Sequence, residues 1–105
     1  MINNRTAIWE FFNPPKPLLE DLTVLYRESD FKTLVYKATE LSLRFPKSLV
    51  LFTMLGAAYS KLRQFDEAES NYREALKINP NFVEAYNNLG IIFGTLIFIL
   101  FKIKP

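Results

Sequence analysis

Apolar and small residues recur every three or four positions along two neighbouring segments in the middle of the chain. One such stripe runs through 48–62 and another through 65–80. This spacing places side chains on one face of an α-helix. Pro80 ends the second segment, because proline cannot continue a helix. The pattern predicts two helices joined by a few polar residues around Arg63 and Gln64, which makes them antiparallel neighbours.

The chain also resembles itself at a period of 34 residues. A shift by this distance superposes FTMLGAAY (52–59) on YNNLGIIF (86–93), which matches aromatic, leucine, glycine and aromatic positions in turn. The same shift superposes Pro46 on Pro80. Self-similarity at a fixed period is typical of repeat proteins, in which each unit packs on its neighbours.

The pattern of residues 49–82 resembles the tetratricopeptide repeat, a helical hairpin with this period. The residues that carry the resemblance here and in the next copy are Phe52, Leu55, Gly56, Tyr59, Ala68, Tyr72, Ala75, Pro80, Tyr86, Leu89, Gly90 and Phe93. Small residues such as Gly56 and Ala68 are expected where two helices cross closely. The resemblance implies an all-α superhelix, or solenoid, of two helical hairpins followed by a C-terminal helix.

The repeat register divides the chain into four parts. Residues 1–14 are a lead segment, 15–48 a divergent first repeat and 49–82 the second repeat, and 83–105 is the first helix of an incomplete third repeat that runs into an apolar tail. The first repeat places Leu22 where the family usually has a small residue. We therefore expect its two helices to lie further apart than those of the second repeat.

The resemblance also implies a function. Proteins that resemble tetratricopeptide arrays usually act as scaffolds that bind peptides or partner domains in a groove lined by the first helix of each hairpin. The residues at the groove positions are Thr23, Tyr26, Arg27, Thr53, Met54, Ala57, Lys61, Glu84, Asn87, Asn88 and Ile91. In sugar-transferring members of the family, asparagines at the place of Asn88 form a ladder that holds a peptide backbone, by donating and accepting hydrogen bonds. Met54 and Glu20 stand at the equivalent places here, so the ladder would have a single rung.

The segment NPPKPLLEDLTVLYRESDF, which begins at Asn13, is similar to the opening of bacterial proteins in which a short repeat array precedes a glycosyltransferase or sulfotransferase domain. No transferase domain follows Phe93 in this sequence. One alternative is therefore that the chain is the detached or truncated binding head of such a protein.

Composition argues against catalysis. The chain has no cysteine and no histidine, which excludes thiol nucleophiles, imidazole bases and almost every zinc site. Its 13 basic and 11 acidic residues are interspersed, so nucleic acid is not an expected partner. The acidic residues after Phe65 are expected to form surface pairs, such as Glu69 with Arg73. We predict a protein that is not an enzyme, that needs no cofactor or metal, and that binds a protein or peptide. A cytoplasmic location is expected, because the amino end lacks the apolar core of a signal peptide.

The end of the chain is uncharged from Ala85 to Phe101. This length is short of the roughly 20 apolar residues of a spanning helix. One interpretation is a tail-anchored, membrane-associated adaptor that uses 85–101; another is a truncated or altered reading frame. A third is a soluble closing helix whose apolar surface forms a homodimer with a second copy. The third predicts a stripe packed on the preceding helix, formed by Tyr86, Leu89, Gly90, Phe93 and Ile97. In this interpretation, four residues of the same helix remain uncovered: Ile92, Phe98, Ile99 and Phe101.

Overall fold

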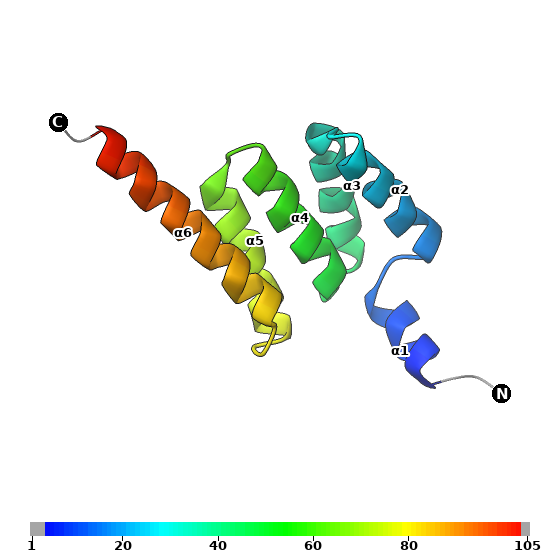
Figure 1. Ribbon diagram of the computed structural model, residues 1–105. Helices are drawn as coiled ribbons and strands as arrows, with labels where there is room; N and C mark the ends of the chain where they lie inside the picture. Colours follow the sequence, from blue (N-terminus) through cyan, green and yellow to red (C-terminus); the bar gives the residue numbers. More distant parts are fainter. Residues whose placement is uncertain (1–3, 104–105) are drawn as a thin grey trace.

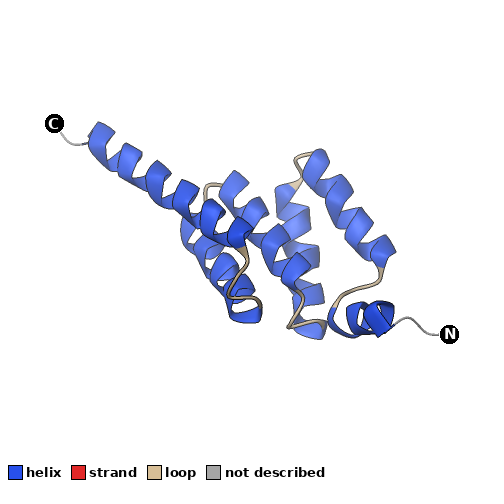
Figure 2. Ribbon diagram, turned by 60° about the horizontal axis from the view of Figure 1, so that its bottom comes forward, coloured by secondary structure: helices blue, strands red, loops and turns tan. Residues whose placement is uncertain are grey.

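The computed structural model describes residues 4–103, and all of the regular secondary structure in this range is helical (Figures 1 and 2). The helices are α1 (Asn4–Phe12), α2 (Lys16–Arg27), α3 (Phe31–Arg44), α4 (Leu49–Lys61), α5 (Phe65–Ile78) and α6 (Val83–Ile103). The predicted all-α fold is confirmed: α2–α3 and α4–α5 are two hairpins, and α6 is the C-terminal helix.

The helices form an extended row. The main packing contacts join helices that are consecutive in the chain, from α2 to α6. The radius of gyration is 15.4 Å and the principal extents are 65 × 29 × 20 Å, whereas a compact chain of this length would have a radius of gyration of about 13 Å. The free end of α6 reaches beyond α5 and contributes to this elongation (Figure 1).

The two hairpin turns have the same backbone geometry. Ser29 and Arg63, which are 34 residues apart, both adopt a left-handed conformation with φ of 60°. In each turn this residue donates its N–H to the carbonyl oxygen three positions earlier at 3.0 Å, and the next residue donates to the carbonyl oxygen five positions earlier at 2.9 Å. These bonds satisfy the last carbonyl groups of the first helix. The assignment of 15–48 as a repeat stays a prediction, which this shared geometry supports.

Two buried clusters stabilise the row. The first lies between α2, α3 and α4 and consists of Leu19, Leu22, Leu34, Ala38, Leu51, Leu55 and Ala58. The second lies between α5 and α6 and consists of Ala68, Tyr72, Ala85, Leu89 and Ile92. Tyr59 of α4 packs against both clusters, so the core is continuous from α2 to α6.

The two hairpins cross differently, as the size of the residue at the crossing predicts. A β-carbon added at Gly56 would lie 2.6 Å from the ring of Tyr72, so glycine allows this ring to approach the α4 backbone. The equivalent residue in α2 is Leu22. Accordingly, α2 makes fewer close backbone contacts with α3 than α4 makes with α5.

The lead segment is helical and is joined to the repeats by hydrogen bonds. The Ser48 hydroxyl donates to Oδ1 of Asn13 at 2.6 Å and accepts from the N–H of Leu51 at 3.3 Å. Ser48 therefore caps α4 and fixes the end of α1 at the same time. Trp9 of α1 packs against the first cluster. Trp9 thus joins the core of the row, whereas Ile8 and Phe11 of the same helix are exposed.

The packing face of α6 corrects one prediction. The buried residues are Ala85, Leu89 and Ile92. The predicted stripe is right for Leu89 and wrong for its other members, which are exposed: Tyr86, Gly90, Phe93 and Ile97. The prediction that Ile92 is uncovered is also wrong, since it is 2% exposed. Phe98 and Phe101 are exposed as expected, and Ile99 is half-buried.

The reason lies in the two different apolar faces of a first helix. In α4, the face that contains Leu51 and Leu55 joins the first cluster with α2 and α3, and the face that contains Gly56 contacts α5. The α6 residues 34 positions after Leu51 and Leu55 are Ala85 and Leu89, and these pack on α5. The other face of α6 has no covering helix within residues 4–103.

Candidate functional site

A groove of about 430 Å³ lies along α4 and α6, beside the turn between α4 and α5. We call it the α4–α6 groove. Its lining residues are Tyr26, Ala57, Ser60, Lys61, Arg63, Phe65, Tyr72, Glu84, Asn88, Ile91, Ile92 and Thr95. Because α4 and α6 are equivalent first helices in the 34-residue register, the groove lies where the repeat pattern places a binding surface.

Part of the predicted groove set lines this groove, namely Tyr26, Ala57, Lys61, Glu84, Asn88 and Ile91. The other predicted residues lie outside it, namely Thr23, Arg27, Thr53, Met54 and Asn87. The hydroxyls of Thr23 and Thr53 donate to carbonyl oxygens of their own helices at 3.0 and 2.8 Å. Met54 packs against the first buried cluster. The predicted residues thus lie on helices that line the groove, whereas Met54 packs inward and the Thr23 and Thr53 hydroxyls bond within their own helices. Their role in binding stays a prediction.

Tyr72 of α5 forms the floor of the groove. Its burial raises the pKa of Tyr72 to about 12, and a hydrogen bond with the Ser60 hydroxyl acts in the opposite direction. Tyr26 and the carboxylate of Glu84 raise this pKa further, because each disfavours another negative charge nearby. The Tyr72 phenol is consequently protonated at neutral pH and has both donor and acceptor capacity.

Opposite charges frame the groove. Lys61 and Arg63 lie at the C-terminal end of α4, and Glu84 lies in the first turn of α6. The guanidinium carbon of Arg63 is 5.3 Å from the ring centroid of Phe65, a distance at which the cation is attracted to the ring face. The half-buried Asn88 adds an amide to the lining of the groove. Apolar walls with a few polar groups of fixed position are typical of binding sites.

Sequence reasoning missed five residues of the groove, namely Arg63, Phe65, Tyr72, Ile92 and Thr95, since it gave Tyr72 a structural role only. Thr95 lies 34 residues after the predicted groove residue Lys61, so the repeat register contained the signal for it. Ile92 lies on the face of α6 that contacts α5. Arg63, Phe65 and Tyr72 come from the turn and from α5, which a pattern based on first helices alone does not include.

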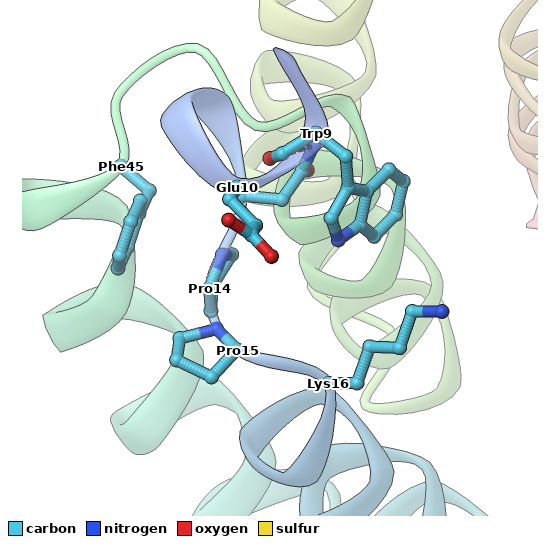
Figure 3. A pocket seen from close by; sticks show the side chains of 7 residues that line it. Trp9, Glu10, Pro14, Pro15, Lys16 and Phe45 are labelled. Carbon is cyan, nitrogen blue, oxygen red and sulfur yellow. Dashed lines mark hydrogen bonds between the residues drawn. The ribbon is translucent and has the colours of Figure 1, made fainter. Parts of the chain in front are cut away.

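A larger hollow, of about 570 Å³, lies where α1 meets α2 (Figure 3). Trp9 and Phe45 lie on opposite sides of it, with Pro14 and Pro15 between them, and the Glu10 side chain points into the space between. The two prolines keep the backbone out of a helix between α1 and α2. This hollow belongs to the joint between the lead helix and the first hairpin, and none of the predicted groove residues lines it.

The predicted Glu69–Arg73 pair is present on the surface of α5, where Nη2 of Arg73 lies 2.8 Å from Oε1 of Glu69. In the part of the chain that the structure describes, no group of three or more acidic residues could hold a metal ion. One helix in the same range, Val83–Ile103, is long and apolar enough to cross a membrane, and 11% of its most apolar 18-residue stretch is buried.

Two family models match the chain, at residues 50–82 and 71–96, and each is described as a tetratricopeptide repeat. Residues 50–96 thus match the tetratricopeptide repeat. The first match coincides with the α4–α5 hairpin, and the second extends from the middle of α5 into α6. The tetratricopeptide match therefore covers both helices along which the α4–α6 groove lies.

Curated relatives agree with this assignment over short stretches. The chain is 32% identical over 63% of its length to a probable UDP-N-acetylglucosamine–peptide N-acetylglucosaminyltransferase of Arabidopsis thaliana. It is 46% identical over 41% of its length to the uncharacterized protein ycf37 of Pyropia yezoensis. It is 43% identical over 51% of its length to the small glutamine-rich tetratricopeptide repeat-containing protein 2 of Mycosarcoma maydis. The matches span 7%, 24% and 14% of these relatives. A bacterial origin stays a prediction.

Proposed function

We propose that this tetratricopeptide protein is a non-catalytic interaction module whose α4–α6 groove holds a short segment of a partner protein. The observation that carries the proposal is the convergence of Lys61, Asn88 and the protonated Tyr72 phenol on one groove between equivalent helices. The likeness to the small glutamine-rich tetratricopeptide protein supports a module of this class.

The charges of the groove suggest the chemistry of the bound segment. Lys61 and Arg63 at one end favour an acidic side chain, and Glu84 on α6 favours a basic one. The Asn88 amide in the same groove suits a peptide group, because it donates and accepts hydrogen bonds. Ala57 and Ile91 add apolar wall. A segment with an acidic and a basic residue separated by small or apolar residues fits this arrangement.

The test is selection of peptides from a random library on the full chain, followed by affinity measurements on variants. Lys61→Ala and Asn88→Ala are expected to weaken binding of the selected peptides about tenfold each, which is the usual effect of removing a polar contact from a binding centre. Asn71→Ala is the matched control, because this amide donates to the Glu67 carbonyl oxygen of its own helix at 2.9 Å on the surface of α5. Equal affinity of all four proteins would refute the groove as the binding site.

A second proposal concerns α6. Its 21 residues extend about 31 Å as a helix, and Leu96 is the last residue that packs on the second cluster. The part after Leu96 therefore measures roughly 10 Å, against about 30 Å for the hydrocarbon core of a membrane. A complete span would require Ala85 and Leu89 to leave their packing on α5. Membrane association is therefore proposed only as the alternative to the packed third repeat helix, and the α6 homodimer stays a prediction beside it.

The Arabidopsis relative is named as a probable glycosyltransferase, and the chain covers 7% of it. This likeness supports the alternative that the chain is the detached or truncated binding head of such a transferase. Expression of the chain next to a separately expressed transferase domain, with co-purification as the readout, would test it. The transferase activity itself is not transferred to this chain.

A further inference from the structure

The exposed face of α6 has a defined shape that the groove does not use. Tyr86, Gly90, Phe93 and Ile97 follow one another along this face at helical spacing, and Tyr86, Phe93 and Ile97 are 54%, 40% and 54% exposed. No atom of residues 4–103 outside the neighbouring backbone lies within 4 Å of an ideal β-carbon at Gly90. The face is therefore apolar, with open space above Gly90 at its centre.

The chain itself shows how such a face is covered. In α4 the residues at the same register positions are Phe52, Gly56 and Tyr59. The α5 helix packs on α4 with the Tyr72 ring seated on Gly56. Ala68 and Ala75 of α5, on either side of Tyr72 along the helix, are both buried. The helix that covers Gly56 thus carries a small residue, an aromatic residue and a small residue in succession at buried positions.

The first hairpin shows the reverse combination. Leu22 stands in α2 at the position of Gly56, and Ala38 stands in α3 at the position of Tyr72. Both are buried in the first cluster. A large residue on the first helix thus goes with a small one on the second, and a glycine goes with an aromatic ring, because the total volume at the crossing is limited.

We infer that the Tyr86–Ile97 face of α6 is a docking surface for an amphipathic helix of a partner, which lies antiparallel to α6 and places an aromatic side chain on Gly90. This helix extends the row by one element in the way that α5 extends it beyond α4. A second α6 does not supply this pattern at the spacing of Ala68, Tyr72 and Ala75, because four and seven positions after Gly90 stand Gly94 and Ile97, and the same steps after Gly94 reach two phenylalanines. The surface is separate from the α4–α6 groove, so it does not depend on the proposed function.

The probe for this surface is a synthetic peptide with the sequence of α5 and its two flanking residues, 64–79, labelled with a fluorophore. A second peptide carries Tyr72→Ala. Each is titrated against the full chain and against the Gly90→Leu variant, which copies the Leu22 side of the first hairpin. Gly90→Leu is not expected to disturb the fold, because the space around Gly90 is open. Ser70→Leu adds the same side chain at an exposed position of α5 and serves as the control.

The wild-type chain and Ser70→Leu are expected to bind the tyrosine peptide on the order of tenfold more tightly than the alanine peptide. Gly90→Leu is expected to reverse this preference, because overpacking at the crossing opposes the ring. The inference is overturned if the ratio of the two affinities is the same for the wild type and Gly90→Leu. It is also overturned if the unlabelled chain forms dimers or binds phosphatidylcholine vesicles through this face and the tyrosine peptide does not compete with either.

Discussion

Replacing Gly56 with alanine tests whether the close approach of Tyr72 determines how α4 crosses α5. The new β-carbon would lie 2.6, 2.7 and 2.8 Å from three ring atoms of Tyr72. Ordinary contact begins at 3.4 Å, so the ring must withdraw by about 0.8 Å. The ring is 2% exposed and packs on Ala68, Leu89 and their cluster, so it has little room to move.

The expected magnitude follows from two opposing effects. Overpacking a filled core costs about 1–3 kcal/mol. Alanine in a helix interior is more favourable than glycine by about 0.8–1 kcal/mol, which offsets part of this cost. Gly90→Ala is the matched control, since it gives the same helix gain where no atom of the described residues opposes the added methyl group. The free energies of unfolding of the two variants should differ by about 1–3 kcal/mol, with Gly56→Ala the less stable.

The assay is urea unfolding of the full chain followed by circular dichroism at 222 nm. We expect Gly90→Ala to be more stable than the wild type and Gly56→Ala to be less stable. A double replacement, Gly56→Leu with Tyr72→Ala, recreates the combination of the first hairpin and should lose less stability than the two single variants together. If Gly56→Ala and Gly90→Ala have the same stability within about 0.5 kcal/mol, the steric account of this crossing is refuted.

Three further variants examine other parts of the row. Ser48→Ala should lower the free energy of unfolding by about 1–3 kcal/mol, because it removes the α4 cap and the donor to Asn13. Ser42→Ala, which loses only a surface hydroxyl, should change this free energy by less than about 0.5 kcal/mol. Equal effects of the two variants in urea unfolding would contradict the capping role of Ser48. Tyr72 has a folded pKa of about 12, above the ordinary 10.0, so its contribution to stability is complete below pH 10 and is lost as pH rises from 10 to 12. Unfolding measured across this range should therefore show a steeper loss for the wild type than for Tyr72→Phe, and parallel curves would exclude the raised pKa. Replacing Phe98 and Phe101 together with serine should leave the free energy of unfolding within about 0.5 kcal/mol of the wild type, because these side chains are 59% and 74% exposed. The same replacement should lower any dimer content in light scattering and any pelleting with vesicles. A large loss of stability would show that the two side chains are packed.

The hairpins were predictable from the sequence because their signals are local. Phe31 and Phe65 begin the second helices, and the chain leaves the helix shortly before Pro46 and Pro80. Proline and polar turn residues act on neighbouring backbone alone, so they can be recognised without knowledge of the fold. Most groove residues on α4 and α6 were predictable because their positions follow from the 34-residue repeat register.

The parts that were missed depend on contacts between distant residues. In α6 the stripe that contains Gly90 and the stripe that contains Leu89 and Ile92 are both apolar, so periodicity does not decide which one packs on α5. That choice depends on whether a second helix covers the other face. The role of the lead segment was missed for a similar reason, since it rests on the bond between Asn13 and Ser48, which are 35 residues apart.

The central claim is that a partner segment binds along α4 and α6 in the groove with Tyr72 at its floor. Nuclear magnetic resonance titration of the ¹⁵N-labelled full chain with a library-selected peptide tests this claim most directly. The account predicts that amide shifts concentrate in residues 57–65 and 88–95, with little change around Asn71 and Lys77 on the outer surface of α5. Shifts centred on that outer surface, or on the hollow between Trp9 and Phe45, would contradict it.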